Sequence, residues 1–223
     1  MISMIVDIET VALKEAASYV TPVQAPSNWK DEAKIKAYIE EKEREQLAKA
    51  ALDIDLCRIV AIGWASNAVE RPSVRLCRTR DEERAALRQA WEDIKEAREV
   101  IGFNCIDFDL PCMIRRSQYL GIRPTLSHHD FNRYRMNKVQ DLMQHLSFMG
   151  KLRFKGLDFY TQRFGIQVED ELRGGDIGAL HAAGDWDGIA SHCVADVAKT
   201  AQLASRLGIL ERWQDERRER RSR

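Results

Sequence analysis

Residues 4–10, which read M-I-V-D-I-E-T, place two acidic side chains on an otherwise apolar segment. The apolar residues from position 2 to position 8 predict a short buried strand. Asp7 and Glu9 stand two residues apart at its end, so both carboxylates project from the same face of the sheet. Two like charges at the end of a buried strand repel and desolvate each other unless a cation lies between them. The pattern therefore indicates half of a metal site.

The spacing of this pair is weak evidence by itself, because the same acidic-x-acidic spacing recurs in the chain. Asp53 with Asp55 and Asp185 with Asp187 also fit it. Those pairs lie in predicted loops, where exposed carboxylates carry no demand for a cation. It is the place of Asp7 and Glu9 on a buried strand that distinguishes them.

Further strands and helices alternate along the rest of the chain. Strands are predicted at residues 58–64, 74–76 and 100–103, the first of them apolar on both faces and therefore central. Thr79 and Glu82 form a T-x-x-E capping box that begins a helix. Further helices are predicted at 30–52, after Pro111, and at 141–148, 157–164, 176–181 and 187–207. Early strands followed by accumulating helices favour an α/β sheet covered by helices.

Length and composition limit the classes of protein to which the chain can belong. The chain has 223 residues and is 44% hydrophobic, enough for one globular domain, which we place at residues 1–210. Lys plus Arg (35) balance Asp plus Glu (35), so net charge points to no partner. No stretch resembles a signal peptide or a membrane span, and we expect a cytoplasmic protein. The five cysteines form no C-x-x-C pair, so we expect neither disulfides nor zinc.

Two further acidic positions stand in suggestive places. Asp109 follows the fourth predicted strand near the N-terminus of a helix, where free N–H groups favour an anion. The alternative is that Asp109 caps this helix, a role for which Asp107 competes. On the last helix, His192 and Asp196 are four residues apart and share a face. A single pair of this kind is usually structural.

Three segments together resemble a known family. They are D-I-E-T at 7–10, G-F-N-C-I-D-F-D-L-P at 102–111 and H-C-V-A-D-V at 192–197. In this order they resemble the three exonuclease motifs of the DEDD 3′–5′ exonucleases. Within that family, the chain resembles most the stand-alone proteins, some of them phage-associated, that are similar to the proofreading exonuclease domain of family-B DNA polymerases. The residues typical of this branch are Asn104, Phe108, Asp109 and Pro111, together with the pair Asp141–Leu142. The resemblance extends from Met4 to Leu207.

The resemblance implies a fold and a metal site. The fold would be α/β, a ribonuclease H-like mixed sheet of three antiparallel strands and then parallel strands, flanked by helices. Two Mg²⁺ or Mn²⁺ ions would be held by four carboxylates, those of Asp7, Glu9, Asp109 and Asp196. Asp7 would bridge both ions. Glu9 and Asp196 would complete the site of the attacking water, and Asp109 would serve the ion at the leaving 3′ oxygen.

The third motif departs from that branch of the family. His192 stands where the branch usually carries tyrosine, so the motif reads as the histidine (DEDDh) type. His192 would be the general base, a role that suits imidazole because it gains and loses a proton near neutral pH. By the same resemblance, Thr10 and the backbone beside it would hold the terminal 3′-hydroxyl, and Asn104 and Phe108 would contact the unpaired end of the strand.

The implied activity is metal-dependent 3′–5′ hydrolysis of nucleic acid with a free 3′ end, expected to be single-stranded DNA. Proofreading or end processing would then occur in trans, in DNA repair beside replication or recombination proteins. One alternative is a catalytically silent nucleic-acid-binding accessory module, which would lack a carboxylate, whereas all four are present. Another is a 3′–5′ exoribonuclease or oligonucleotidase on the same fold, since no group is identified that reads a 2′-hydroxyl.

Three segments outside the motifs remain open. The charged helix within about 28–52 resembles a subfamily insertion. Between Asp107 and Lys155, nine basic residues are interleaved with Tyr119, Phe131 and Tyr134, and they could either bind a phosphate backbone or form a solvated surface. The nine are Arg115, Arg116, Arg123, Arg133, Arg135, Lys138, Lys151, Arg153 and Lys155. His128 and His129 are interpreted as loop residues rather than ligands. The Arg-rich tail 211–223 is either a solvated helix end or an electrostatic arm.

Overall fold

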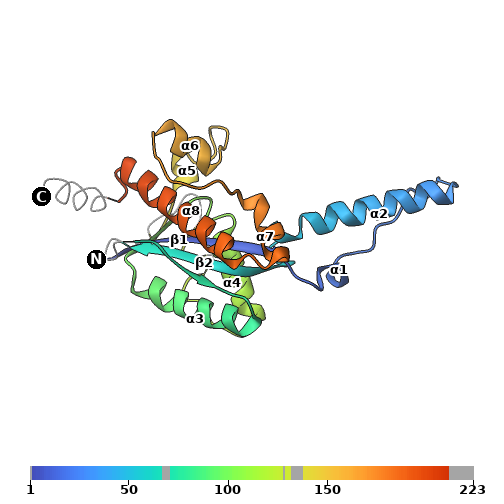
Figure 1. Ribbon diagram of the computed structural model, residues 1–223, viewed down its shortest axis with the longest axis horizontal. Helices are drawn as coiled ribbons and strands as arrows, with labels where there is room; N and C mark the ends of the chain where they lie inside the picture. The colour runs from blue at the N-terminus through green and yellow to red at the C-terminus, as the bar shows by residue number, and fades with distance from the viewer. Residues whose placement is uncertain (1, 67–70, 128, 132–137, 211–223) are drawn as a thin grey trace, which may run out of the picture.

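A computed structural model describes residues 2–66, 71–127, 129–131 and 138–210, so the tail 211–223 lies outside the described residues. Its centre is a five-stranded sheet in the order β3-β2-β1-β4-β5 (Figure 1). The strands are β1 (Ser3–Ala12), β2 (Cys57–Ser66), β3 (Ser73–Leu76), β4 (Glu99–Gly102) and β5 (Val139–Asp141). The pairs β1–β2 and β2–β3 are antiparallel, and β1–β4 and β4–β5 are parallel. The predicted mixed sheet is confirmed.

Helices cover both faces of this sheet. They are α1 (Ala16–Tyr19), α2 (Glu32–Ala48), α3 (Arg80–Glu96), α4 (Asp109–Tyr119), α5 (Leu142–Leu146), α6 (Leu157–Arg163), α7 (Ile177–Ala183) and α8 (Trp186–Arg206), with 3₁₀ turns η1 (Ala50–Leu52) and η2 (Gly174–Asp176). Helices α3 and α4 pack on one face, and α8 crosses the other (Figure 1). The capping box of Thr79 and Glu82 begins α3 as predicted.

The alternation of side chains along β1 fixes these layers. Met4, Val6 and Ile8 are buried in the core beneath α3 and α4. Ile5 is buried with residues of α8 on the opposite face. Because side chains alternate along a strand, Asp7 and Glu9 share one face, as predicted, and it is the face that α8 covers.

Two predicted boundaries are wrong. Strand β1 does not end near Ile8 but pairs with β2 as far as Ala12, across a register shift between Glu9 and Thr10. Asp7 and Glu9 therefore lie within the strand. The start of the predicted helix 141–148 is also wrong. Val139–Asp141 pairs with β4 as a strand, and α5 begins only at Leu142. Three residues are too few for a periodic signal.

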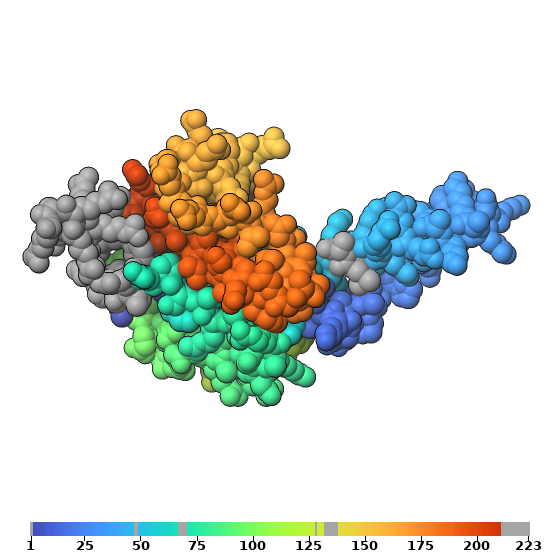
Figure 2. Space-filling model, in the orientation of Figure 1, coloured from blue at the N-terminus to red at the C-terminus, as the bar shows by residue number. Residues whose placement is uncertain are grey.

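The predicted charged helix within 28–52 is present as α2 and η1. Helix α2 projects away from the sheet, and its described side chains are exposed or half-buried (Figures 1 and 2). Ion pairs such as Lys36–Glu40 and Lys42–Glu45 run along its surface. Helix α2 therefore adds little to the core.

The cysteines and the lengths of the helices bear on the class of protein. All five cysteines are buried as free thiols. Within the described ranges, the helices are too short or too polar to span a bilayer.

Candidate active site

The site is built on β1 beneath α8. Asp7 lies opposite Gly63 of β2. A Cβ at Gly63 would lie 2.7 Å from Sγ of Cys193 and 2.8 Å from Cγ2 of Val197, so only glycine lets α8 approach this closely. The thiol of Cys193 in turn lies 3.9 Å from Oδ2 of Asp7. The sequence of β2 thus brings α8 down onto the β1 carboxylates.

Asp109 reaches the same place from β4 and α4. It is the first residue of α4, and its Oδ1 accepts a hydrogen bond from the backbone N–H of Ile8 at 3.1 Å. The carboxylate therefore lies against the backbone between Asp7 and Glu9. The alternative role as helix cap is wrong, because the N-cap residue is Phe108 and no side chain caps it.

The loop that carries Asp109 is held by the buried carboxylate of Asp141. Its oxygens accept hydrogen bonds from the backbone N–H groups of Asn104, Ile106, Met143 and Gln144. Two of these donors belong to the loop after β4 and two to α5. Asp141 thus ties the path toward Asp109 to the end of β5, a structural role that the pair Asp141–Leu142 did not reveal in the sequence.

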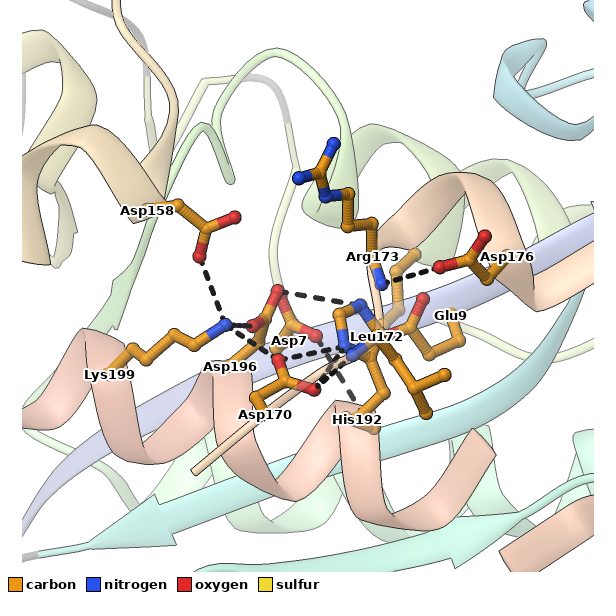
Figure 3. Close-up of polar contacts among 12 residues, drawn as sticks. Asp7, Glu9, Asp158, Asp170, Leu172, Arg173, Asp176, His192, Asp196 and Lys199 are labelled. Carbon is orange, nitrogen blue, oxygen red and sulfur yellow. Dashed lines mark hydrogen bonds and ion pairs between the residues drawn. The ribbon is translucent and has the colours of Figure 1, made fainter. Parts of the chain in front are cut away.

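Helix α8 contributes His192 and Asp196, one turn apart on the face toward β1 (Figure 3). His192 is buried, and its Nε2 lies 3.8 Å from Oε1 of Glu9 and 3.9 Å from Oδ2 of Asp196. Its Nδ1 lies 3.0 Å from Oδ2 of Asp170. The imidazole therefore stands between the two carboxylates on one side and Asp170 on the other.

Lys199 and Asp170 complete the site and were missed from the sequence. Nζ of Lys199 donates to Asp170 at 2.6 Å, Asp196 at 2.8 Å and Asp158 at 3.0 Å (Figure 3). Lys199 follows Asp196 by three positions, a spacing that places it on the same helix face. Asp170 lies in an irregular segment before η2, and no local pattern marks it.

The electrostatics of the cluster reflect crowded, buried acids. Burial and then the neighbouring carboxylates raise the pKa of Asp7 and of Glu9 well above their usual values. Burial raises the pKa of Asp109 to about 7, although its hydrogen bond from Ile8 opposes the shift. Burial raises the pKa of Asp170 too, but the hydrogen bond from Lys199 and the charge of His192 outweigh it and leave that pKa lowered. Asp7, Glu9 and Asp109 therefore need a nearby cation to ionise fully.

Among the described residues, two groups of side chains could hold a metal ion. The ligand atoms of Asp7, Glu9 and Cys193 lie within 4.8 Å of one another, and so do those of Asp170, His192 and Asp196. Burial raises the pKa of the Cys193 thiol well above its usual value, which keeps it protonated and a poor ligand. The remaining donors at β1 are carboxylate oxygens, which suit hard cations such as Mg²⁺ or Mn²⁺.

The three predicted substrate residues lie in different surroundings. The Thr10 hydroxyl donates to the carbonyl of Ala51 at 2.6 Å, so its side chain is already occupied. Asn104 has a φ of 61°, a left-handed conformation that turns the chain after β4. Phe108 is partly buried against the core beneath α3 and α4.

The interpretation of residues 115–155 as one basic and aromatic surface is wrong in part. Arg116 is buried in a two-hydrogen-bond pair with Glu83, and Phe131 is buried in the core. Arg115 pairs with Asp55. Arg133, Tyr134 and Arg135 lie outside the described residues, as does His128, whereas His129 lies in an exposed turn.

Comparisons with known proteins show the family and the fold of the chain. A family model described as a predicted 3′–5′ exonuclease related to the exonuclease domain of PolB matches residues 50–219. Among solved structures, the family B DNA polymerase from the hyperthermophilic archaeon Pyrobaculum calidifontis aligns over 93% of this chain with a TM-score of 0.63 and 15% identity. The chain spans 24% of that polymerase, and the likeness concerns the fold alone. No curated protein matches the chain.

Proposed function

Because this chain belongs to the family of predicted 3′–5′ exonucleases related to the exonuclease domain of PolB, we propose that it removes nucleotides from the 3′ end of single-stranded DNA. The observation that carries the proposal is the convergence of four carboxylates and an imidazole on one face of the sheet. Asp7 and Glu9 come from β1, and Asp109 lies against the backbone between them. Asp196 and His192 come from α8.

Two Mg²⁺ or Mn²⁺ ions would be held by Asp7, Glu9, Asp109 and Asp196. The fit rests on the donor set, because crowded buried carboxylates with raised pKa values are stabilised by divalent cations. When bound, such ions neutralise the charge that develops on the phosphodiester and on its leaving 3′ oxygen.

His192 is proposed to accept the proton of the attacking water at Nε2. A carboxylate at Nδ1 favours the tautomer whose proton is on that nitrogen, which leaves Nε2 able to accept another. Asp170 lies 3.0 Å from Nδ1 and supplies that carboxylate. Asp170 is therefore a positioning residue that acts through His192.

Lys199 is proposed to position Asp196. Burial lowers the pKa of Lys199, but hydrogen bonds to Asp170 and Asp196 outweigh it, so the ammonium stays charged. An ammonium 2.8 Å from Oδ1 of Asp196 limits the rotamers of that carboxylate. It also links the metal carboxylates to the pair of His192 and Asp170.

The proposed contacts with the substrate rest on the resemblance to the family. Since the Thr10 hydroxyl is bound to Ala51, the backbone beside Thr10 would hold the terminal 3′-hydroxyl. Asn104 and Phe108 flank the loop into Asp109 and would contact the unpaired end. The proposed biological role is to process 3′ ends for a polymerase that is a separate protein.

The test is digestion of 5′-labelled DNA and RNA strands of one sequence with Mg²⁺ or Mn²⁺. We expect a ladder that descends by one nucleotide from the 3′ end and stops on chelation, with DNA degraded faster than RNA. Degradation from the 5′ end, or internal cuts alone, would contradict the proposed activity. Faster degradation of RNA would keep the chemistry but replace the substrate.

A further inference from the structure

The segment 148–164 gathers exposed aromatic side chains beside the candidate active site. Of the nine large apolar side chains exposed among the described residues, five lie in this segment: Phe148 (65% exposed), Leu152, Phe154, Phe159 and Phe164. Scattered exposed apolar residues are ordinary, but a cluster marks an interaction surface. We call residues 148–164 the aromatic lobe; it begins just after α5 and includes α6.

The charge of the aromatic lobe is strongly positive. Its basic residues are Lys151, Arg153, Lys155 and Arg163, all of them exposed. Its single acidic residue, Asp158, is paired with Lys199. Arg153, Phe154 and Lys155 alternate cation and ring along the chain, and Nζ of Lys155 lies 5.2 Å from the centroid of the Phe159 ring. Alternating positive charge and aromatic rings suit a single-stranded polyanion with unpaired bases.

The backbone at the start of the aromatic lobe is left-handed. Phe148, Met149 and Gly150 have successive φ values of 54°, 59° and 80°. Left-handed conformations at two consecutive non-glycine residues are strained, and such strain is concentrated at ligand sites. The turn is closed by a hydrogen bond from the N–H of Met149 to the carbonyl of Gln144 at 2.8 Å.

The aromatic lobe is anchored next to the metal carboxylates. Leu157 and Tyr160 of α6 pack against the same core cluster as α8. Asp158 in the first turn of α6 accepts from Lys199, whose Nζ also donates to Asp196 (Figure 3). In Figure 2 this segment, coloured gold, projects from the body directly beside α8. A strand whose 3′ end reaches Asp196 would thus have its upstream nucleotides within reach of the lobe.

We propose that the aromatic lobe binds the unpaired upstream nucleotides of the strand whose 3′ end enters the active site. The proposal rests on the proposed exonuclease function and adds to it a binding surface outside the three exonuclease motifs. Bases would stack on the exposed rings, and the basic residues between them would contact phosphates. The complementary charge favours a single-stranded nucleic acid over a protein partner.

The experiment compares two variants of the full chain. The aromatic variant carries Phe148→Ala, Phe154→Ala and Phe159→Ala, and the charge variant carries Lys151→Ala, Arg153→Ala and Lys155→Ala. Tyr19→Ala on α1 and Arg88→Ala on α3 are matched controls, since Tyr19 is 65% exposed and Arg88 is exposed. Binding of a dye-labelled 20-nucleotide strand is measured by anisotropy in EDTA, which prevents hydrolysis.

The aromatic variant is expected to raise Kd at least about tenfold, because stacking of one base contributes a factor of roughly 5 to 150. The charge variant is expected to reduce the slope of log K against log salt by up to about 2, at about 0.7 for each phosphate contact. Both controls should bind as the unchanged protein does. An unchanged Kd in the aromatic variant and an unchanged slope in the charge variant would overturn the proposal and leave a protein partner as the explanation of the surface.

A second substrate separates the lobe from the active site. The p-nitrophenyl ester of thymidine 5′-monophosphate is too small to reach the lobe, so both variants should hydrolyse it with Mn²⁺ within about twofold of the unchanged protein. An equal loss on this ester and on the strand would mean that the lobe only supports the fold of the site, which overturns the proposal. Failure of the unchanged protein to hydrolyse either substrate would instead contradict the exonuclease function.

Discussion

Nδ1 of His192 lies 3.0 Å from Oδ2 of Asp170, and both side chains are buried. The contact joins α8 to an irregular segment 22 residues earlier in the chain. Carboxylate–imidazole pairs of this kind set the tautomer and the orientation of the ring. The pair gives the proposed general base a fixed direction toward Glu9 and Asp196.

The first prediction separates the base from its positioning residue. His192→Ala should lower kcat by about 10²- to 10⁴-fold while metal affinity stays near normal. Asp170→Asn should lower kcat by about 10- to 100-fold with little change in KM. If Asp170 acts through His192, adding Asp170→Asn to His192→Ala should cost little more activity. Single-turnover rates on a labelled strand measure all three variants.

Asp158→Asn is the matched control for Asp170→Asn. It removes another carboxylate that contacts Lys199 but touches no atom of the imidazole pair. We expect it to keep kcat within a few-fold. Multiplicative losses in the double variant of Asp170 and His192 would show that Asp170 acts independently, through Lys199 rather than through the imidazole.

The second prediction concerns the carboxylate at the centre of the site. Asp7→Asn should abolish hydrolysis with Mg²⁺ or Mn²⁺ and leave the protein folded, because the change removes a charge that burial and its neighbours disfavour. Activity and circular dichroism measure the two effects. Asp187→Asn, an exposed acid in the unrelated acidic-x-acidic pair, should change neither. An Asp7→Asn protein that fails to fold would indicate a structural role.

The third prediction is a pH dependence of stability. Burial raises the pKa of Asp109 to about 7 in the folded protein, whereas an unfolded aspartate titrates near 4. Between these values the metal-free native state holds a proton that the unfolded chain has lost, so its stability falls as pH rises. Mg²⁺ or Mn²⁺ binds the ionised form, so the melting temperature gained with metal over EDTA should grow from pH 6 to pH 8.

Asp109→Asn isolates this contribution, because an amide does not titrate. The variant in EDTA should lose less stability than the unchanged protein between pH 6 and pH 8. Identical pH profiles for the two proteins would mean that Asp109 is ionised without metal. A metal-induced gain that shrinks toward pH 8 would contradict the proposed ligand set.

The fold was predictable wherever one segment carried enough periodicity. The apolar run at the start of β1, the apolar run of β2 and the capping box of Thr79 with Glu82 are each local, and the strand, the central strand and the helix start that they predict are all present. The strand β5 was missed because three residues paired to β4 have no period of their own. The far end of β1 was missed because its pairing with β2 continues through polar Thr10. The sequence of one segment does not show which other strand it pairs with or how far that pairing extends.

The residues of the candidate site likewise divide into those that local sequence predicts and those that only the folded chain brings together. The residues predicted as metal ligands and base lie in short motifs, and the structure brings them to one face. Asp170 and Lys199 depend on tertiary contacts, since Asp170 meets His192 only after the segment before η2 folds across α8. The exposed rings of the aromatic lobe were overlooked because burial, which separates Phe131 from Phe148, is not a local property of sequence.

The last prediction concerns the distance between α8 and the sheet. Gly63→Ala would place a Cβ 2.7 Å from Sγ of Cys193 and 3.3 Å from its backbone carbonyl, so the helix itself must move. Overpacking of this kind costs about 1–3 kcal/mol, or roughly 2–4 °C of melting temperature for each kcal/mol. Because α8 carries His192 and Asp196, kcat should fall by more than the loss of folded protein explains. Gly178→Ala in α7 makes the same chemical change with no atom within 4 Å, and it should preserve both stability and activity. Equal behaviour of the two alanine variants would mean that α8 tolerates the added methyl group and that its approach to β1 does not limit the reaction.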